Sequence, residues 1–277
     1  MAPQTYKYIT KLAQKRVLII GGSSGIGYAA AEASLEHGAA VLLASSSAAK
    51  LASAASRLRE SYPHPHPLLS PSASHSPDVS TFVIDLSDLA NLTTNLITLL
   101  DRATDNGSSK IDHVVYTADT SPSLPPLSQT TPTHITSALS LRAYAPLLLA
   151  SVLKSTIPKY IPRSPDASIT FTNGCSSHRP VPGWAVADAA AGAMEGLVRG
   201  LASDLAPLRV NLVSAGPVTT ELFWTLPEEK TELYKEKCLT RRLGRPEDVA
   251  EAYLYLMKDG FITGSTIFTE GGRILSL

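Results

Sequence analysis

The sequence predicts an α/β fold in which a doubly wound parallel sheet carries helices on both of its faces. Short, wholly apolar runs rich in Val, Ile and Leu are typical of strands buried on both faces, as in parallel sheets. These runs alternate with segments of ten or more residues of helical character, which is the pattern of consecutive βαβ units. A glycine-rich turn follows the first run directly. Together these observations favour one continuous sheet with right-handed crossovers.

The expected elements follow one another along the chain in this order. Residues 15–21, Lys-Arg-Val-Leu-Ile-Ile-Gly, form a short apolar strand, and an Ala- and Glu-rich helix is expected over 26–37. A second strand is predicted at 39–44 and a second helix at 47–61. Later strands are predicted at 81–84, 113–116, 168–172, 209–213 and 266–269, with a long Ala-rich helix over 185–205.

Residues 62–80 interrupt this alternation with a tract dense in Pro, Ser and His. Because proline removes a ladder donor, the tract is predicted to be an insertion at the sheet edge. His64 and His66 could bind a metal, but no third ligand of the right kind lies nearby in the sequence, so a solvated loop is favoured. We expect residues 1–277 to form a single domain and no metal site.

Composition excludes several classes of function. The 24 basic and 24 acidic residues balance, and no basic run indicates nucleic acid or an anionic membrane as a partner. Two cysteines, Cys175 and Cys238, are too few for a disulfide framework and favour a reducing compartment. No unbroken apolar stretch approaches the ~18–20 residues that span a bilayer, and residues 1–16 lack the apolar segment of a secretory signal. We therefore expect a cytosolic protein that acts on a small molecule.

The turn after the first strand has the spacing of a dinucleotide-binding loop. Gly21, Gly25 and Gly27 lie in Gly-Gly-Ser-Ser-Gly-Ile-Gly, between a predicted strand and a predicted helix. In such loops the first glycine permits the tight turn, the second lets backbone approach the pyrophosphate, and the third lets the helix pack close to the strand. The helix N-terminus then offers free amides to phosphate. A purely structural glycine turn is the alternative.

Further motifs in the same order resemble the short-chain dehydrogenase/reductase family, from about residue 15 to the C-terminus. Asp85-Leu86 matches the family's acid that contacts adenine. The family's loop over the nicotinamide matches residues 211–220, and its C-terminal signature matches residues 242–250 and 261–272. The resemblance implies a Rossmann fold with a nicotinamide cofactor. The residues implied to contact that cofactor are Gly21, Ser23, Ser24, Gly25, Ile26, Gly27, Asp85, Leu86, Ala118, Arg142, Gly216, Pro217, Val218 and Thr220.

The end of the second strand favours NADP(H) over NAD(H). NAD-specific sites place Asp or Glu there to bind the ribose 2′-hydroxyl, and that carboxylate repels a 2′-phosphate. This chain has no acid in the segment and offers Ser45, Ser46, Ser47 and Lys50 instead, although the arginine often used for the phosphate is absent.

The positions that carry the family's proton relay have changed. The family donates a proton from a Tyr whose pKa is lowered by a Lys one helical turn later. In this chain the Tyr position falls at Ala187 and the Lys position at Ala191, while the Ser position falls at Asn173 or Gly174. The Asn position falls at Arg142. Nucleotide binding is therefore expected to persist without the usual acid.

That combination favours reduction of C=N over C=O. Hydride addition to a ketone makes an alkoxide that needs an acid, whereas addition to an iminium gives a neutral amine. The arrangement resembles the fungal branch typified by the malbrancheamide and paraherquamide reductases, with Arg142 and Trp184 in common. That branch reduces a cyclic iminium dipeptide and then guides a Diels–Alder closure. Its active-site acid has no counterpart here, because Val181 stands three residues before Trp184.

Several residues are candidates for catalysis or substrate binding, each with a structural alternative. Arg142 would face the cofactor and substrate, and its alternative is a surface arginine. Trp184 would line the substrate pocket, and its alternative is a side chain of the core. His178 lies in the loop after the fifth predicted strand, Asp119 at a strand end that also suits a turn, and Asp188 on a helix face that also suits an interface. Three functions stay open: an NADPH-dependent imine or iminium reductase, a redox-neutral NADP-binding cyclase or isomerase, and a non-enzymatic NADP-binding protein. The Ala-rich helix favours a homodimer or homotetramer.

Overall fold

The computed structural model describes residues 6–63, 78–119, 125–221 and 227–276. Within these ranges one sheet has the strand order β3-β2-β1-β4-β5-β6-β7, and every pair of neighbouring strands is parallel. This order, with helical crossovers, is the doubly wound Rossmann arrangement that the sequence predicts. The strands are β1 (Arg16–Ile20), β2 (Ala40–Ser45), β3 (Val79–Val83), β4 (His113–Tyr116), β5 (Ser168–Gly174), β6 (Arg209–Ala215) and β7 (Thr266–Thr269).

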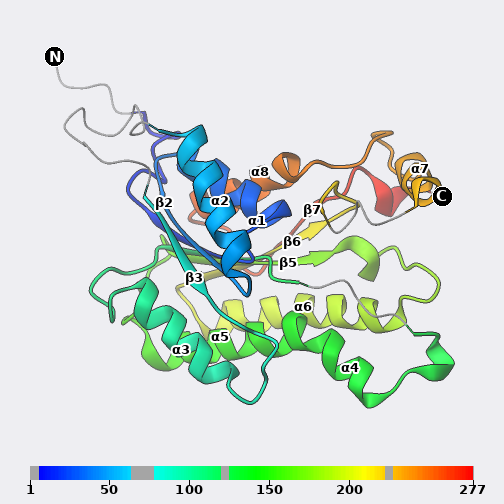
Figure 1. Ribbon diagram of the computed structural model, residues 1–277, viewed down its shortest axis with the longest axis horizontal. Helices are drawn as coiled ribbons and strands as arrows, with labels where there is room; N and C mark the ends of the chain where they lie inside the picture. Colours follow the sequence, from blue (N-terminus) through cyan, green and yellow to red (C-terminus); the bar gives the residue numbers. More distant parts are fainter. Residues whose placement is uncertain (1–5, 64–77, 120–124, 222–226, 277) are drawn as a thin grey trace.

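Helices cover both faces of the sheet, as Figure 1 shows. One face carries α1 (Gly25–Glu36), α2 (Ala48–Ser61) and α8 (Pro246–Lys258), and the other carries α3 (Leu92–Ala103), α5 (Ala145–Thr156) and α6 (Ala185–Asp204). The short helices α4 (Pro132–Leu139) and α7 (Glu228–Glu236) lie toward one end of the molecule. Shorter turns are η1 (Leu127–Gln129), the π-helical η2 (Ser140–Tyr144), η3 (Cys175–Ser177) and η5 (Arg273–Leu275).

The core is divided in two by the sheet because side chains alternate between its faces. Along β1, Leu18 and Ile20 belong to the cluster under α3, α5 and α6, while Val17 and Ile19 belong to the cluster under α1 and α8. All four are at most 1% exposed. Burial of both faces explains why the strand has a continuous apolar run and no polar alternation.

Element boundaries differ from the sequence prediction by about two residues at three strands: β5 and β6 end later than predicted, at Gly174 and Ala215, and β3 begins earlier. The edge strand β3 begins at Val79, two residues before the predicted start, and α2 ends at Ser61 with Tyr62 as its C-cap. The insertion does join the edge strand of the sheet. Its central part, including His64 and His66, lies outside the described residues.

One helical stretch corrects the expectation that nothing in the chain could cross a membrane. Pro132–Thr156, which joins α4, η2 and α5, is long and apolar enough by length and composition alone. Sequence inspection missed it because serine, threonine and single charged residues interrupt its apolar positions. Its α5 part packs into the main core through Leu149 and Leu153, both fully buried. Of its most apolar 18-residue window, 33% is buried inside the described part of the protein.

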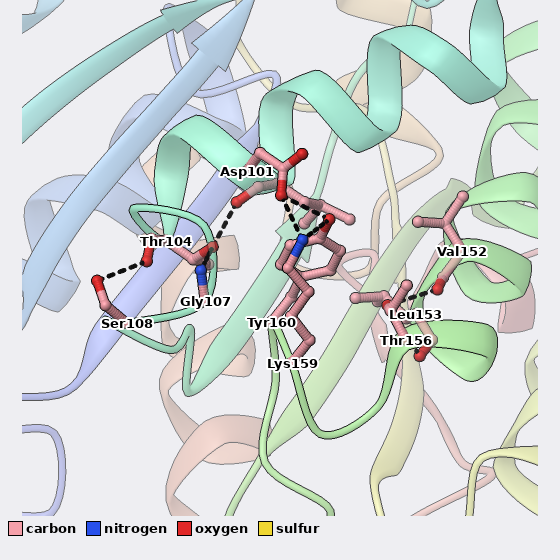
Figure 2. Close-up of polar contacts among 10 residues, drawn as sticks. Asp101, Thr104, Gly107, Ser108, Val152, Leu153, Thr156, Lys159 and Tyr160 are labelled. Carbon is pink, nitrogen blue, oxygen red and sulfur yellow. Dashed lines mark hydrogen bonds and ion pairs between the residues drawn. The ribbon is translucent and has the colours of Figure 1, made fainter.

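A polar network fixes the amino-terminal edge of the sheet (Figure 2). The Lys159 ammonium donates to Asp101 Oδ1 at 2.7 Å, and the Tyr160 hydroxyl donates to the same oxygen at 2.7 Å. The Tyr160 carbonyl also accepts from the Ile111 amide just before β4. This adjacent Lys and Tyr therefore connect α3 to the start of β4, at the edge opposite the carboxyl ends of the strands, where ligands of this fold bind.

Candidate cofactor and active site

The glycine-rich turn between β1 and α1 forms a backbone cradle that side chains would fill. A Cβ on Gly27 would lie 2.3 Å from the Gly21 carbonyl oxygen and 2.4 Å from Thr117 Oγ1. Gly21 has φ +99°, and a Cβ there would lie 2.6 Å from the Ala118 amide nitrogen. Steric exclusion therefore requires glycine at both positions, and Ala118 comes to the turn from the end of β4.

The first turn of α1 leaves its backbone amides open to an anion. Its N-cap Ser24 makes no side-chain capping hydrogen bond, and no acid stands in the first turn. Gly25 (φ +53°) faces Thr220, whose Cγ2 would lie 3.1 Å from a Cβ on Gly25. Ser24, Gly25 and Ile26 thus lie where a helix N-terminus binds phosphate, with Thr220 from the loop after β6 beside them.

The loop after β6 begins later than expected. Residues 211–215, which the sequence comparison assigned to the loop over the nicotinamide, are the buried second half of β6. The loop itself starts at Gly216, where a Cβ would lie 2.6 Å from Glu270 Cα. Pro217 follows, and Val218 is 6% exposed and pairs with Gly244. The start of the loop is therefore anchored at two places, Gly216 and Val218, before the chain reaches Thr220.

The end of β2 gathers hydroxyl groups beside the glycine turn. Ser23 donates from its hydroxyl to Ser45 Oγ at 3.0 Å, so the turn and the end of β2 are joined. Ser47 is the N-cap of α2 and accepts from the Lys50 amide at 3.3 Å. Ser46 and the Lys50 side chain are exposed. No acid lies at this strand end, between Ser45 and Lys50.

The acid after β3 is held in an ionised turn. Both the amide and the hydroxyl of Ser87 donate to Asp85 Oδ1, at 2.8 and 2.6 Å. Hydrogen bonding from Ser87 lowers the pKa of Asp85 below its ordinary value. Leu86 is 5% exposed and packs into the core, which fixes the direction of the loop. The carboxylate is thus kept as an acceptor, as contact with an adenine amino group requires.

An ion pair lies at the carboxyl end of β4. Arg142 Nη2 and Asp119 Oδ2 are 2.6 Å apart, and the arginine side chain is 16% exposed. Arg142 is in the π-helical η2, a type of bulge that is frequent at functional sites. The two sequence candidates are therefore brought together, and Asp119 offsets the charge of Arg142.

The tyrosine nearest to this pair is not available as a proton donor. Tyr116, the last residue of β4, is 1% exposed and donates its hydroxyl to the Leu141 carbonyl at 2.8 Å. Burial raises the pKa of Tyr116 above its ordinary value. The hydrogen bond from the Tyr116 hydroxyl to the Leu141 carbonyl holds η2, which contains Arg142, against the end of β4.

The face of α6 that approaches the end of β5 carries Ala187 and Ala191, the positions that the sequence analysis assigns to the family's Tyr and Lys. Ala187 and Ala191 are 5% and 4% exposed and one helical turn apart. Asn173 donates from Nδ2 to the Ala191 carbonyl at 3.0 Å. Trp184, half-buried, is the N-cap of α6. Asp188 Oδ1 is buried and lacks a hydrogen-bond partner within the described part of the chain.

The structure adds Glu195, which sequence analysis missed. Its Oε1 accepts from the Ser177 hydroxyl at 2.6 Å, and its Oε2 lies 3.0 Å from His178 Nε2. The His178 ring also meets Phe268 edge-on, with centroids 4.9 Å apart. Glu195 is four residues after Ala191 and so on the same helix face, a signal that the sequence did contain. His178 is therefore fixed by α6 and β7 rather than free in its loop.

Comparison with known proteins agrees with this geometry. A family model described as an SDR-like Rossmann domain matches residues 8–276. The chain is 42% identical to the short-chain dehydrogenase/reductase malC of Malbranchea aurantiaca, covering 99% of this chain and all of that protein. It is 37% identical to the short-chain dehydrogenase/reductase fsr5 of Gibberella fujikuroi, with 98% of each chain covered.

Solved structures give the same result. The MalC reductase/Diels-Alderase from Malbranchea aurantiaca superposes with a TM-score of 0.85 at 40% identity, over 96% of this chain and 99% of that one. A short-chain dehydrogenase/reductase from Serratia marcescens, at 24% identity and a TM-score of 0.79 over 95% and 99% of the two chains, shares the fold. The chain belongs to the short-chain dehydrogenase/reductase family, whose Rossmann domain binds a nicotinamide cofactor.

Proposed function

We propose that this protein is an NADPH-dependent reductase of an imine or iminium intermediate in fungal specialised metabolism, of the alkaloid type. The observation that carries the proposal is the pairing of an intact nucleotide cradle with buried alanines at 187 and 191. The similarity to malC and to the MalC reductase/Diels-Alderase supports the biosynthetic setting.

The described residues fit an NADP molecule. The glycine cradle and the uncapped start of α1 suit the pyrophosphate, and the Asp85 carboxylate suits the adenine. Ser45, Ser46 and Lys50 suit the 2′-phosphate because they offer donors without a competing carboxylate. When bound, NADPH supplies a hydride.

The chemistry of the acceptor follows from what the α6 face lacks. A carbonyl group that gains hydride needs a proton, and a positioned acid contributes roughly 10²–10⁴ in rate. Neither alanine can give one, and Tyr116 is committed to the Leu141 carbonyl. An iminium carbon becomes a neutral amine without any proton. The site therefore suits reduction of an iminium, or of an imine that is already protonated when it binds.

Arg142 is compatible with a cationic substrate because its charge is offset. An isolated guanidinium beside the nicotinamide would repel an iminium, but the 2.6 Å pair with Asp119 makes the local charge close to zero. The guanidinium N–H groups of Arg142 that do not bind the Asp119 carboxylate can donate to a substrate amide oxygen or to the cofactor ribose. We assign Arg142 to positioning, and Trp184 to the wall of the substrate site.

A double substitution tests this proposal. Ala187→Tyr with Ala191→Lys restores the family's acid. If the protein were a carbonyl reductase that had lost this acid, the double variant would reduce ketones much faster than the wild type. We expect no gain with a cyclic iminium substrate, measured as loss of NADPH absorbance. Ala187→Phe with Ala191→Met is the matched control, since it restores bulk without an acid. A large ketone gain confined to the Tyr/Lys variant would refute the proposal.

A redox-neutral cyclisation is the second candidate, and the similarity to the MalC reductase/Diels-Alderase favours it. Val181 gives no acid in the loop before Trp184, which argues against the same second step here. Product formed with oxidised NADP, without NADPH consumption, would establish the cyclase. Turnover of NADPH in step with product would exclude it.

We further propose a cytosolic homodimer or homotetramer. Both cysteines, Cys175 and Cys238, are buried free thiols, as expected in a reducing compartment. On the exposed side of α6, Gly192, Gly196 and Gly200 have nothing within 4 Å of a built Cβ, so a second helix could approach closely. Sedimentation of the purified protein measures this state directly.

A further inference from the structure

Arg273 is a buried cation, and one of its guanidinium nitrogens lacks a hydrogen-bond partner within the described part of the chain. It is the first residue of η5, directly after Gly272, and only 6% of its surface is exposed. Its Nη1 is fully buried and has no hydrogen-bond partner among the described residues. A guanidinium stays charged at any physiological pH, and burying it unpaired is strongly unfavourable. Such a group needs either a structural reason or a ligand.

Among the described residues no carboxylate forms an ion pair with Arg273, although the charges of Arg273 and Glu270 both act on the Cys175 and Cys238 thiols. The guanidinium carbon lies 5.2 Å from the centroid of the Tyr234 ring, a cation–π contact with α7. Glu270, the nearest acid along the chain, uses Oε2 to accept from the Ile274 amide at 2.9 Å. Burial raises the pKa of the neighbouring Cys175 thiol to about 11, and the positive charge of Arg273 opposes that rise. The guanidinium thus lies beside an aromatic ring and near the Cys175 and Cys238 thiols, and Glu270 is the described acid that acts on the same thiols.

The position of Arg273 links it to the proposed active site. Cys175 follows Gly174, one of the two residues at the family's Ser position, and Gly174 pairs with Ala215 at the end of β6. Gly216, which starts the loop toward Thr220, packs directly on Glu270. Arg273 therefore lies behind the carboxyl ends of β5 to β7, between η3 and α7. The half-buried Tyr234 ring from α7 lies against the guanidinium.

We propose that Arg273 is a binding site for a carboxylate carried by the substrate, held under α7 beside the reacting centre. A planar guanidinium matches a carboxylate with two parallel hydrogen bonds, which a thiol or a ring cannot provide. The cation–π contact stabilises the charge until the ligand arrives. This proposal rests on the proposed function in one respect, that the carboxylate belongs to the substrate of the reductase.

Binding without turnover tests the inference separately from the reductase activity. We would titrate the full-length protein with N-acetylglycine, and with its neutral amide as the ligand control, by isothermal calorimetry. Arg273→Met should weaken carboxylate binding at least tenfold, and the neutral amide should bind no better to either protein. Arg163→Gln, which removes an exposed arginine from the loop before β5, is the matched control and should bind as the wild type does.

The melting temperature separates a ligand site from a structural one. Replacing a buried, unpaired charge by an apolar side chain of similar size is expected to keep or raise Tm, whereas loss of a structural arginine lowers it. If the Arg273→Met variant does not fold, Arg273→Gln is the second variant for the same measurements. Unchanged carboxylate affinity in a folded Arg273 variant, or no preference of the wild type for the carboxylate over the amide, would overturn the proposal. Either result leaves the iminium reductase proposal standing.

Discussion

His113 should make the folded protein measurably sensitive to mild acid. It begins β4, is 2% exposed, and its Nδ1 lies 2.9 Å from Ser168 Oγ on the neighbouring strand. Burial lowers the pKa of His113 from 6.5 to about 3, and the charges of Arg209 and Lys15 act in the same direction. The nearby carboxylate of Asp112 opposes this shift but does not cancel it. The native imidazole is therefore neutral where an unfolded one is protonated.

The sign and size of the effect follow from proton linkage. Between pH 6.5 and about 3 the unfolded chain binds a proton at His113 that the native state excludes, so stability falls as pH falls through this window. The loss reaches about 1.4 kcal/mol for each pH unit once pH is well below 6.5. At pH 5 it amounts to about 2 kcal/mol relative to pH 7, a large part of the ~5–15 kcal/mol typical of a domain.

Urea unfolding at pH 7, 6 and 5, followed by circular dichroism, measures this loss. Other groups titrate in the same range, so the informative quantity is the difference between the wild type and His113→Asn, whose amide can take the place of Nδ1. The variant should lose about 2 kcal/mol less between pH 7 and pH 5. His37→Asn, at a half-exposed site on the C-cap of α1, is the control and should keep the wild-type slope. Equal slopes in the wild type and His113→Asn would refute the reasoning.

Two further predictions concern the cofactor and the active site. The unmodified protein should bind NADPH at least tenfold more tightly than NADH, and Ser46→Asp should reverse that order because a fixed negative charge repels the 2′-phosphate; calorimetry showing equal binding to the wild type would contradict this. Arg142→Ala should reduce turnover tenfold or more with little change in Tm, and Arg142→Lys should restore little because a point charge lacks the planar donors. Turnover unchanged by Arg142→Ala would place this residue outside the site.

The fold was predictable because its signals are local. Strands buried on both faces require continuous apolar runs, and the runs at β1, β4 and β6 were found within a few residues of their true limits. The cradle was equally local, since Gly21 and Gly27 are fixed by turn geometry and steric exclusion. The start of β3 was less well predicted. Its burial alternates, as an edge strand's does, and the Pro-rich tract before it obscures the boundary.

The candidate site was predictable only where one segment carries it. Alignment placed Ala187 and Ala191 on one helix face and Arg142 beside the cofactor, but it did not pair Arg142 with an acid. The structure shows its partner to be Asp119, from a different strand end. Glu195 was missed because its partners, Ser177 and His178, lie on another element.

The sequence by itself determined the sheet, the glycine turn, the absence of an acid after β2 and the loss of the Tyr/Lys pair, since each depends on residues close together in the chain. Only the tertiary structure decided which charges meet and which are left alone. Arg142 pairs with Asp119, whereas Nη1 of the buried Arg273 has no hydrogen-bond partner among the described residues, and the two arginines look alike in a linear sequence. The reason is physical: the free energy of a charge depends on its burial and on atoms within a few ångströms, and crossovers between strands bring those atoms from distant segments.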